Sequence, residues 1–162
     1  MKKRVYIETS VISYLTARPS RDLILAARQA VTEQWWREHR SRYDVFVSRL
    51  VDSEIEQGDT EAKLRRRGTA AMLTRLEVIA ESDELVARLL RSHALPAVAQ
   101  DDAAHVALAT VHKMDILLTW NCKHIANVIM MPKILATIRE ANYEPPLITT
   151  PANLWDSSGE QP

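Results

Sequence analysis

The chain has 162 residues, a length typical of one domain that can bury its own core without disulfides or structural metals. Basic and acidic side chains both number 21, so no overall charge excess indicates a nucleic-acid or membrane partner, and any phosphate-binding surface must be local. A single cysteine, Cys122, excludes an internal disulfide framework and cysteine-based zinc motifs. The three glycines form no phosphate-binding loop or dinucleotide fingerprint.

No segment of the sequence is typical of a signal peptide or a membrane span. The basic residues at positions 2–4 lead directly into a three-residue apolar run and then Glu8, without the longer apolar region of a signal peptide. Nothing approaches the 18 or so consecutive apolar residues of a membrane helix. We therefore expect a cytoplasmic protein.

The first third of the chain reads as two strand–helix units. Residues 5–7 are a short β-prone run that ends in a carboxylate, Glu8, and Ser10 then opens an apolar-periodic stretch through Leu15. Apolar residues recur at helical spacing from 20 to about 40, which predicts one long amphipathic helix. Residues 44–48 predict a second buried strand, and a helix over 50–57 stops at Gly58.

The rest of the chain continues this alternation. Thr60 is a suitable N-cap for a helix, and Ser82, followed by two acidic residues, is a suitable start for another. The expected elements are helices at 60–73, 82–91, 98–112 and 132–141, and strands at 76–80, 115–119 and 147–149.

Alternating strands and helices predict an α/β sandwich with a mainly parallel sheet. The sequence has no internal repeat, linker or low-complexity block, so we expect a single domain over residues 1–155 and a flexible tail over 156–162. In open parallel sheets, functional groups gather beyond the carboxyl ends of the strands.

Oxygen-bearing side chains lie where four segments should meet at that edge. They are Glu8 after the first strand, Asp52 and Glu54 after the second, Asp101 and Asp102 at the start of the helix over 98–112, and Asn121 after the strand over 115–119. Hard divalent cations such as Mg²⁺ and Mn²⁺ prefer such ligands, and a cation would relieve the repulsion between crowded carboxylates. The set therefore predicts a metal site.

Taken singly, each acid has a simpler interpretation. Asp101 or Asp102 could serve as a helix cap or dipole partner, and Glu54 could lie on a solvated face. Periodicity does not choose between Asp101 and Asp102. His105 could face the acids, but a lone helical histidine is more often a packed or surface residue, and we favour that interpretation. His124 beside Cys122 lacks the partners of a zinc site.

Four short motifs resemble those of the PIN domain superfamily, and in particular its VapC-like branch of toxin ribonucleases. They are VYIETS at 5–10, SRLVDSEI at 48–55, DAAHVALA at 102–109 and LLTWNCKH at 117–124. Together they cover the domain from end to end, and they are specific as an ordered set. The resemblance implies a three-layer α/β/α sandwich.

The resemblance also assigns site residues. Glu8 stands where the family usually has its first aspartate, Glu54 and Asp102 match the second and third acids, and Asn121 falls at a fourth, often acidic position. Ser10 and Thr119 match hydroxyl positions that support the site. Glu8 lengthens the ligand arm by one methylene, and Asn121 removes a charge, which favours occupancy by one metal rather than two.

The function implied is that of an Mg²⁺- or Mn²⁺-dependent endoribonuclease, the toxin of a type II toxin–antitoxin system. Such proteins resemble one another in forming homodimers and in being neutralised by a small antitoxin, for which the exposed face of the helix over 20–40 is a candidate surface. The basic run Arg65, Arg66 and Arg67 is a candidate RNA contact, although such runs are usually solvated helix faces.

Two alternatives remain open at this point. The departures at Glu8 and Asn121 are compatible with a PIN module that has weak or no activity and binds RNA or a protein partner. The same acids could also serve a structure-specific DNA nuclease or a phosphatase.

Overall fold

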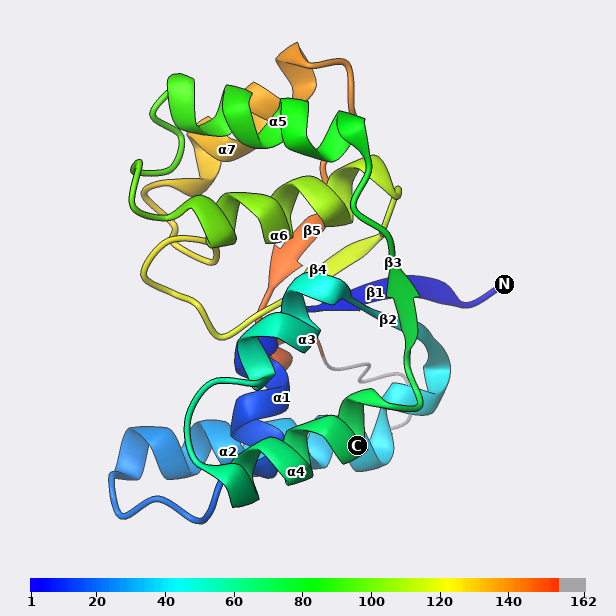
Figure 1. Ribbon diagram of the computed structural model, residues 1–162, viewed down its shortest axis with the longest axis vertical. Helices are drawn as coiled ribbons and strands as arrows, with labels where there is room; N and C mark the ends of the chain where they lie inside the picture. Colours follow the sequence, from blue (N-terminus) through cyan, green and yellow to red (C-terminus); the bar gives the residue numbers. More distant parts are fainter. Residues whose placement is uncertain (155–162) are drawn as a thin grey trace, which may run out of the picture.

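Five parallel strands form one sheet in the order β3-β2-β1-β4-β5 (Figure 1). The computed structural model of the protein describes residues 1–154, so the tail expected over 156–162 lies outside the described residues. The strands are β1 (Lys3–Ile7), β2 (Tyr43–Ser48), β3 (Thr74–Leu76), β4 (Ile116–Leu118) and β5 (Leu147–Thr149). Every strand pair is parallel, which confirms the predicted sheet type.

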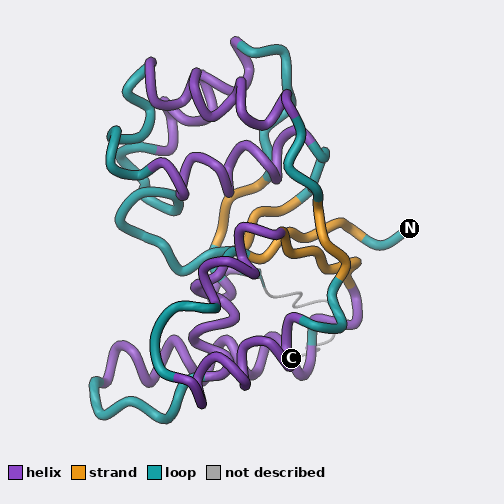
Figure 2. The backbone as a smooth tube through the Cα atoms, viewed as in Figure 1, coloured by secondary structure: helices purple, strands orange, loops and turns teal. Residues whose placement is uncertain are grey.

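Helices cover both faces of this sheet and make the three layers that the motifs implied (Figures 1 and 2). One group packs together through α1, α2, α3 and α4, and the other through α5, α6 and α7. The helices are α1 (Thr9–Thr16), α2 (Leu23–Glu38), α3 (Arg49–Ile55), α4 (Thr60–Ala70), α5 (Ala80–Arg91), α6 (Gln100–Val111) and α7 (Met131–Glu140), with short 3-10 turns η1 (Arg40–Arg42) and η2 (Pro151–Asn153).

The central strands are buried on both faces, as continuous apolar runs in parallel sheets require. Val5, Tyr6 and Ile7 at the end of β1 are fully inaccessible, and the three residues of β4 are buried beside them. Each such aliphatic side chain contributes about 1.5–3 kcal/mol of stability by leaving water. The edge of the sheet that carries the acids is therefore supported by the buried strands β1 and β4.

The predicted strand over 76–80 was wrong in position. Only Thr74–Leu76 pairs with β2, Val78 is half exposed, and α5 begins at Ala80. The physical reason is the cap of α5: the Ile79 N–H donates to the Ser82 hydroxyl at 3.1 Å, so Ser82 lies inside the first turn and the helix starts earlier than predicted.

An aspartate caps two other helices: α4 starts at Thr60 as predicted but with a different N-cap, and α2 starts at Leu23 rather than near residue 20. The Asp59 carboxylate accepts from the N–H groups of Glu61 and Ala62, so Asp59 rather than Thr60 is the N-cap of α4. Asp22 accepts from the Leu25 N–H at 2.9 Å and starts α2 at Leu23. A carboxylate next to the positive end of a helix is a stronger acceptor than a hydroxyl.

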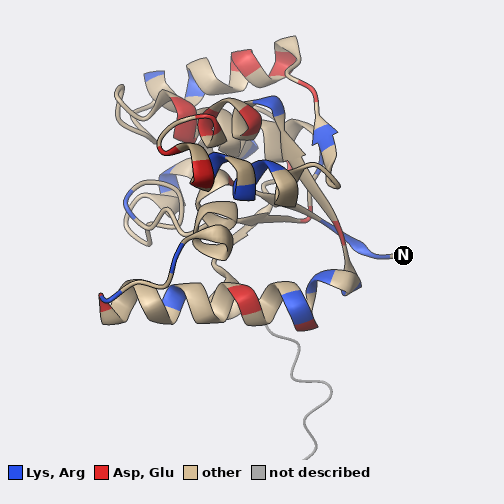
Figure 3. Ribbon diagram, turned by 60° about the horizontal axis from the view of Figure 1, so that its bottom comes forward, with Lys and Arg blue, Asp and Glu red and all other residues tan. Residues whose placement is uncertain are grey.

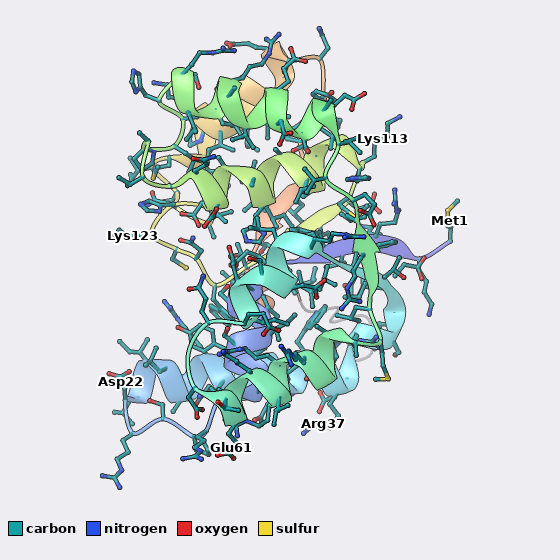
Figure 4. All side chains as sticks on the ribbon, in the orientation of Figure 1. Met1, Asp22, Arg37, Glu61, Lys113 and Lys123 are labelled. Atoms are coloured by element: carbon teal, nitrogen blue, oxygen red, sulfur yellow. The ribbon has the colours of Figure 1, made fainter. Side chains whose placement is uncertain are left out.

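The direction of the chain across the sheet reverses between β1 and β4. From β1 it proceeds through β2 to β3 at one edge, then returns to β4 and β5 on the other side of β1. Figure 4 shows Lys113 and Lys123, which precede and follow β4, on opposite sides of the molecule. Lys123 thus marks the carboxyl edge, where parallel sheets place their functional groups.

None of the helices in the described part of the chain has both the length and the hydropathy needed to cross a bilayer.

Candidate active site

Glu8 is a buried carboxylate held by neutral donors at the end of β1. It is only 6% exposed, and it forms the N-cap of α1. Its oxygens accept hydrogen bonds from the Ser10 N–H at 3.1 Å, from the Thr119 hydroxyl at 2.6 Å and from the Ser10 hydroxyl. The cap explains the sharp turn from strand to helix, and the hydroxyls position the carboxylate without neutralising its charge.

Glu54 and His105 meet Glu8 from two other elements. Glu54 projects from α3, and both of its oxygens lie 3.1 and 3.2 Å from Nε2 of His105 on α6. The same nitrogen is 4.0 Å from Oε1 of Glu8. The side chain of His105 is 1% exposed and that of Glu54 is 21% exposed, so this contact lies largely out of water.

The charges of these groups stabilise one another. Burial disfavours the charged carboxylate of Glu54, but the hydrogen bond and charge of His105 outweigh it and hold the pKa of Glu54 below its usual value. Burial likewise favours a neutral His105 ring, yet the hydrogen bond to Glu54 and the negative charges of Glu8, Glu54 and Asp102 raise its pKa. The site attracts positive charge.

Tyr6 supports the far side of the His105 ring. Its hydroxyl lies 2.7 Å from Nδ1 of His105 and 2.8 Å from the Ser48 hydroxyl at the end of β2. Burial raises the pKa of Tyr6, the nearby Glu8 and Glu54 charges raise it further, and the hydrogen bond to Ser48 opposes them only in part. The phenol therefore stays protonated and can both donate and accept.

Glu8, Glu54 and His105, here called the Glu8 cluster, can hold a divalent cation. One ligand atom from each lies within 4.8 Å of the others, and the three residues come from the turn between β1 and α1, from α3 and from α6. Two carboxylates and one imidazole form a donor set that divalent transition ions accept. The fit is thus one of chemistry as well as of distance.

Asp102 lies in a second group at the same edge, which we call the Asp102 group, with Asn121 and His124. One Asp102 oxygen accepts from the Asn121 amide at 2.8 Å, and the other lies 2.6 Å from Nδ1 of His124. The neighbouring Asp101 is exposed. The structure thus separates the two aspartates that periodicity could not separate, but it does not bring Asp102 into the Glu8 cluster.

Asn121, Ser10 and Thr119 link the two groups. The Asn121 backbone N–H donates to the Thr119 hydroxyl at 2.9 Å, and the Asn121 side-chain oxygen accepts from the His124 N–H at 3.0 Å. Ser10 accepts from the Trp120 N–H at 2.8 Å. The two predicted hydroxyls therefore contact Glu8 directly, whereas Asn121 contacts Asp102.

The basic run on α4 is occupied by contacts within the protein. Arg65 bonds Glu61 at 2.7 Å and the Thr16 carbonyl at 2.9 Å, Arg66 donates to the Ile55 and Gln57 carbonyls, and Arg67 pairs with Glu56. Asp52, another candidate acid, forms a two-pronged ion pair with Arg75 at 2.7 and 2.9 Å. These side chains fasten α3 and α4 to their neighbours.

His105 and His124 are the site residues that sequence reasoning undervalued. His105 is packed, as favoured, but its ring also faces the acids. A usable signal was present, because His105 follows Asp102 by three residues and so shares its side of α6. His124 gave no comparable signal, since its contact with Asp102 depends on how the loop after β4 folds back.

Comparison with known proteins yields structural likeness without close sequence similarity. No family model and no curated protein sequence matches the chain. VapC20 of Mycobacterium tuberculosis, described as a sarcin-ricin loop cleaving toxin, is similar over 76% of this chain and 95% of its own, with a TM-score of 0.59 and 16% identity.

A chain of the VapBC2 complex from Rickettsia felis, solved with a DNA fragment from its promoter, gives a TM-score of 0.59 at 11% identity over 94% of this chain and 99% of its own. These likenesses show that the protein has the fold of VapC-like PIN domains, as the motifs predicted.

Proposed function

We propose that the protein is a metal-dependent endoribonuclease and the toxin of a type II toxin–antitoxin system. The observation that carries this proposal is Glu8, a 6%-exposed carboxylate held by Ser10 and Thr119 with Glu54 and His105 beside it. A buried acid that receives only neutral donors is costly unless a cation joins it. The VapC-like fold supports the assignment to RNA cleavage.

In this proposal the side chains divide the work. Glu8 and Glu54 hold Mg²⁺ or Mn²⁺, Ser10 and Thr119 fix the direction of the Glu8 carboxylate, and Asp102 with Asn121 completes the polar edge across which the phosphodiester lies. A bound divalent cation supplies an activated water and stabilises charge on the phosphate during hydrolysis.

One observation favours a second candidate, a PIN module with weak or no activity. Each oxygen of Asp102 already has a partner, Asn121 or His124, so a cation bound to Asp102 would share an oxygen with one of these contacts or displace it. The cost of breaking a hydrogen bond to a charged group is about 1.5–3 kcal/mol. This cost lowers activity without abolishing a site built around Glu8.

RNA also requires positive charge beside the acidic edge. A contact between RNA and Arg65, Arg66 or Arg67 would compete with the internal bonds of these side chains. Arg28 on α2 is a better candidate, because its guanidinium lies over the Trp120 ring at 5.3 Å and, within the described residues, pairs with no carboxylate. The Trp120 N–H donates to the Ser10 hydroxyl, so Arg28 contacts a residue whose backbone borders the site.

A protein partner and a second copy of the chain are part of the same proposal. Charged residues are few in the first half of α2 (Figure 3), and Leu23, Ile24 and Leu25 at its start are 86%, 67% and 40% exposed. Such an apolar stretch suits a protein contact better than solvent. A cognate antitoxin bound there, a homodimer and a cytoplasmic location follow the toxin assignment.

The test is cleavage of labelled single-stranded RNA by the purified protein with Mg²⁺ or Mn²⁺, with and without EDTA. Glu54→Gln keeps the side-chain shape but removes the charge, and Glu84→Gln, an exposed residue on α5, is the matched control. We expect cleavage that EDTA and Glu54→Gln abolish and that Glu84→Gln preserves. Cleavage that survives Glu54→Gln would contradict the proposed site, and no cleavage by any form would favour the silent module.

A further inference from the structure

We propose that His105 is itself a ligand of the cation, through Nε2, and that the site therefore prefers a divalent transition ion to Mg²⁺. The inference rests on the proposed function and deepens it, because it names the third donor beside Glu8 and Glu54. It replaces an all-oxygen site with one that contains a nitrogen. Imidazole suits transition ions, whereas Mg²⁺ prefers oxygen ligands and bound water.

The separations between the donor atoms support a shared ion. Nε2 of His105 lies 3.1 Å from Oε1 of Glu54 and 4.0 Å from Oε1 of Glu8. Two ligands about 2.1 Å from one octahedral ion lie about 3.0 Å apart when adjacent and about 4.2 Å apart when opposite. The two separations that involve Nε2 therefore match those of ligands around one ion, and all three donor atoms lie within 4.8 Å of one another.

The environment of Nε2 also requires positive charge. An imidazole lone pair directed at two carboxylates inside the protein is repelled by them, and little water reaches this point to screen the repulsion. Either a proton or a metal ion must lie between Nε2 and the acids. A metal ion satisfies all three donors at once, whereas a proton on Nε2 satisfies Glu54 and leaves Glu8 4.0 Å away.

The other side of the ring has a partner suited to the tautomer that a metal-bound histidine needs. With Nδ1–H donating to the Tyr6 hydroxyl at 2.7 Å, the Tyr6 O–H is free to donate to Ser48 at 2.8 Å. This tautomer leaves the Nε2 lone pair facing Glu8 and Glu54. Histidines that bind metals almost always donate their second N–H to such a fixed acceptor, which orients the ring.

Asp102 is the competing third ligand, and its contacts argue against it. Its two oxygens are bound to Asn121 and His124, whereas Nε2 of His105 faces the acids that belong to the site. To join a cation, His105 gives up its Nε2 contact with Glu54 but keeps its position beside Glu8 and Glu54, whereas Asp102 lies in the neighbouring group.

The test is pulsed electron paramagnetic resonance of Mn²⁺ bound to the full-length protein grown with ¹⁵N-histidine. A histidine ligand gives nitrogen modulation at the ¹⁵N frequency in the wild type, without any substitution. We expect this signal in the wild type and in His124→Gln, the matched control, and its loss in His105→Gln together with about tenfold weaker Mn²⁺ binding. Mg²⁺ should compete less well against Mn²⁺ in the wild type than in His105→Gln.

A second variant keeps the inference testable if His105→Gln does not fold. Tyr6→Phe leaves the His105 imidazole in place but removes the hydroxyl that contacts its Nδ1. We therefore expect the nitrogen signal to remain while Mn²⁺ affinity falls about tenfold. Bound Mn²⁺ without nitrogen modulation would overturn this inference and leave the proposed nuclease intact. Failure to bind Mn²⁺ at all would contradict both.

Discussion

The two carboxylate groups at the sheet edge are satisfied in opposite ways. Glu8 receives hydroxyl and backbone donors from Ser10 and Thr119, which fix its position but leave its charge for a cation. Asp102 accepts a hydrogen bond from the Asn121 amide, and its other oxygen lies 2.6 Å from Nδ1 of the His124 imidazole. The difference teaches that the kind of partner matters as well as its presence: Glu8 accepts only from hydroxyl and backbone groups, whereas one oxygen of Asp102 contacts an imidazole.

The largest effect should come from Glu8→Gln. The substitution preserves size but removes the charge, so RNA cleavage should fall by about 100- to 1000-fold, a loss typical of removing one group that stabilises charge at the reacting phosphate. The rate of cleavage of labelled RNA at saturating Mn²⁺ measures it, with circular dichroism to verify folding. A threefold change in rate corresponds to about 0.65 kcal/mol in activation free energy. A rate closer to the wild type than this would show that Glu8 is not part of the site.

Asp102→Asn should have a smaller effect, of about 10- to 100-fold on cleavage, because Asp102 lies outside the Glu8 cluster that is proposed to hold the cation. Asp101→Asn changes the exposed neighbouring acid and is the matched control, expected to leave the rate unchanged. If Asp102→Asn were as damaging as Glu8→Gln, the two carboxylates would be equivalent and the comparison above would fail.

Tyr6→Phe tests how much the hydrogen bonds behind the Glu8 cluster contribute to the stability of the fold. Deleting this buried hydroxyl leaves both the Ser48 hydroxyl and Nδ1 of His105 without their partner, which should lower the free energy of unfolding by about 1–3 kcal/mol. Urea denaturation measures the change. Tyr14→Phe, at a half-buried residue outside the Glu8 cluster, is the control, and an equal loss there would show that the Tyr6 network is not special.

Arg28→Gln should have the smallest effect. Losing one phosphate contact should weaken RNA binding by a few fold at low salt and reduce the slope of log affinity against log salt by about 0.7. Binding titrations at several salt concentrations measure both. Arg65→Gln is the matched control, because the Arg65 guanidinium already bonds Glu61 and the Thr16 carbonyl. An equal change in slope in Arg65→Gln would indicate that α4 contacts the RNA.

Where a strand is buried on both faces, the sequence alone predicted it well. The apolar runs of β1 and β4 were assigned to strands within one to two residues of their ends, because a continuous apolar run has few other stable placements. β5, at one edge of the sheet, was also placed at its observed bounds, but β3, at the other edge, was missed in position. Leu76 to Ile79 has a β-prone composition, but pairing with β2 ends at Leu76, and that depends on contacts far along the chain.

The candidate site shows the same limit. Ser10 and Thr119 could be matched through the motif resemblance, and they follow the ends of β1 and β4 by three residues and one residue, at the edge that strand ends in a parallel sheet share. The placement of Asp102 and His105 depended on the rotation of α6 and on the loop that brings His124 back to the helix. Spacing along one helix does not encode either feature.

The most direct test of the central claim is Mn²⁺ binding, measured by calorimetry, in the wild type, Glu8→Gln and Asp102→Asn. We expect the dissociation constant to rise by at least about tenfold in Glu8→Gln and to stay within about threefold in Asp102→Asn. The reason is that Glu8 belongs to the cluster proposed to hold the cation, and Asp102 does not. Binding that is lost in Asp102→Asn but retained in Glu8→Gln would contradict the account and centre the metal site on the Asp102 group.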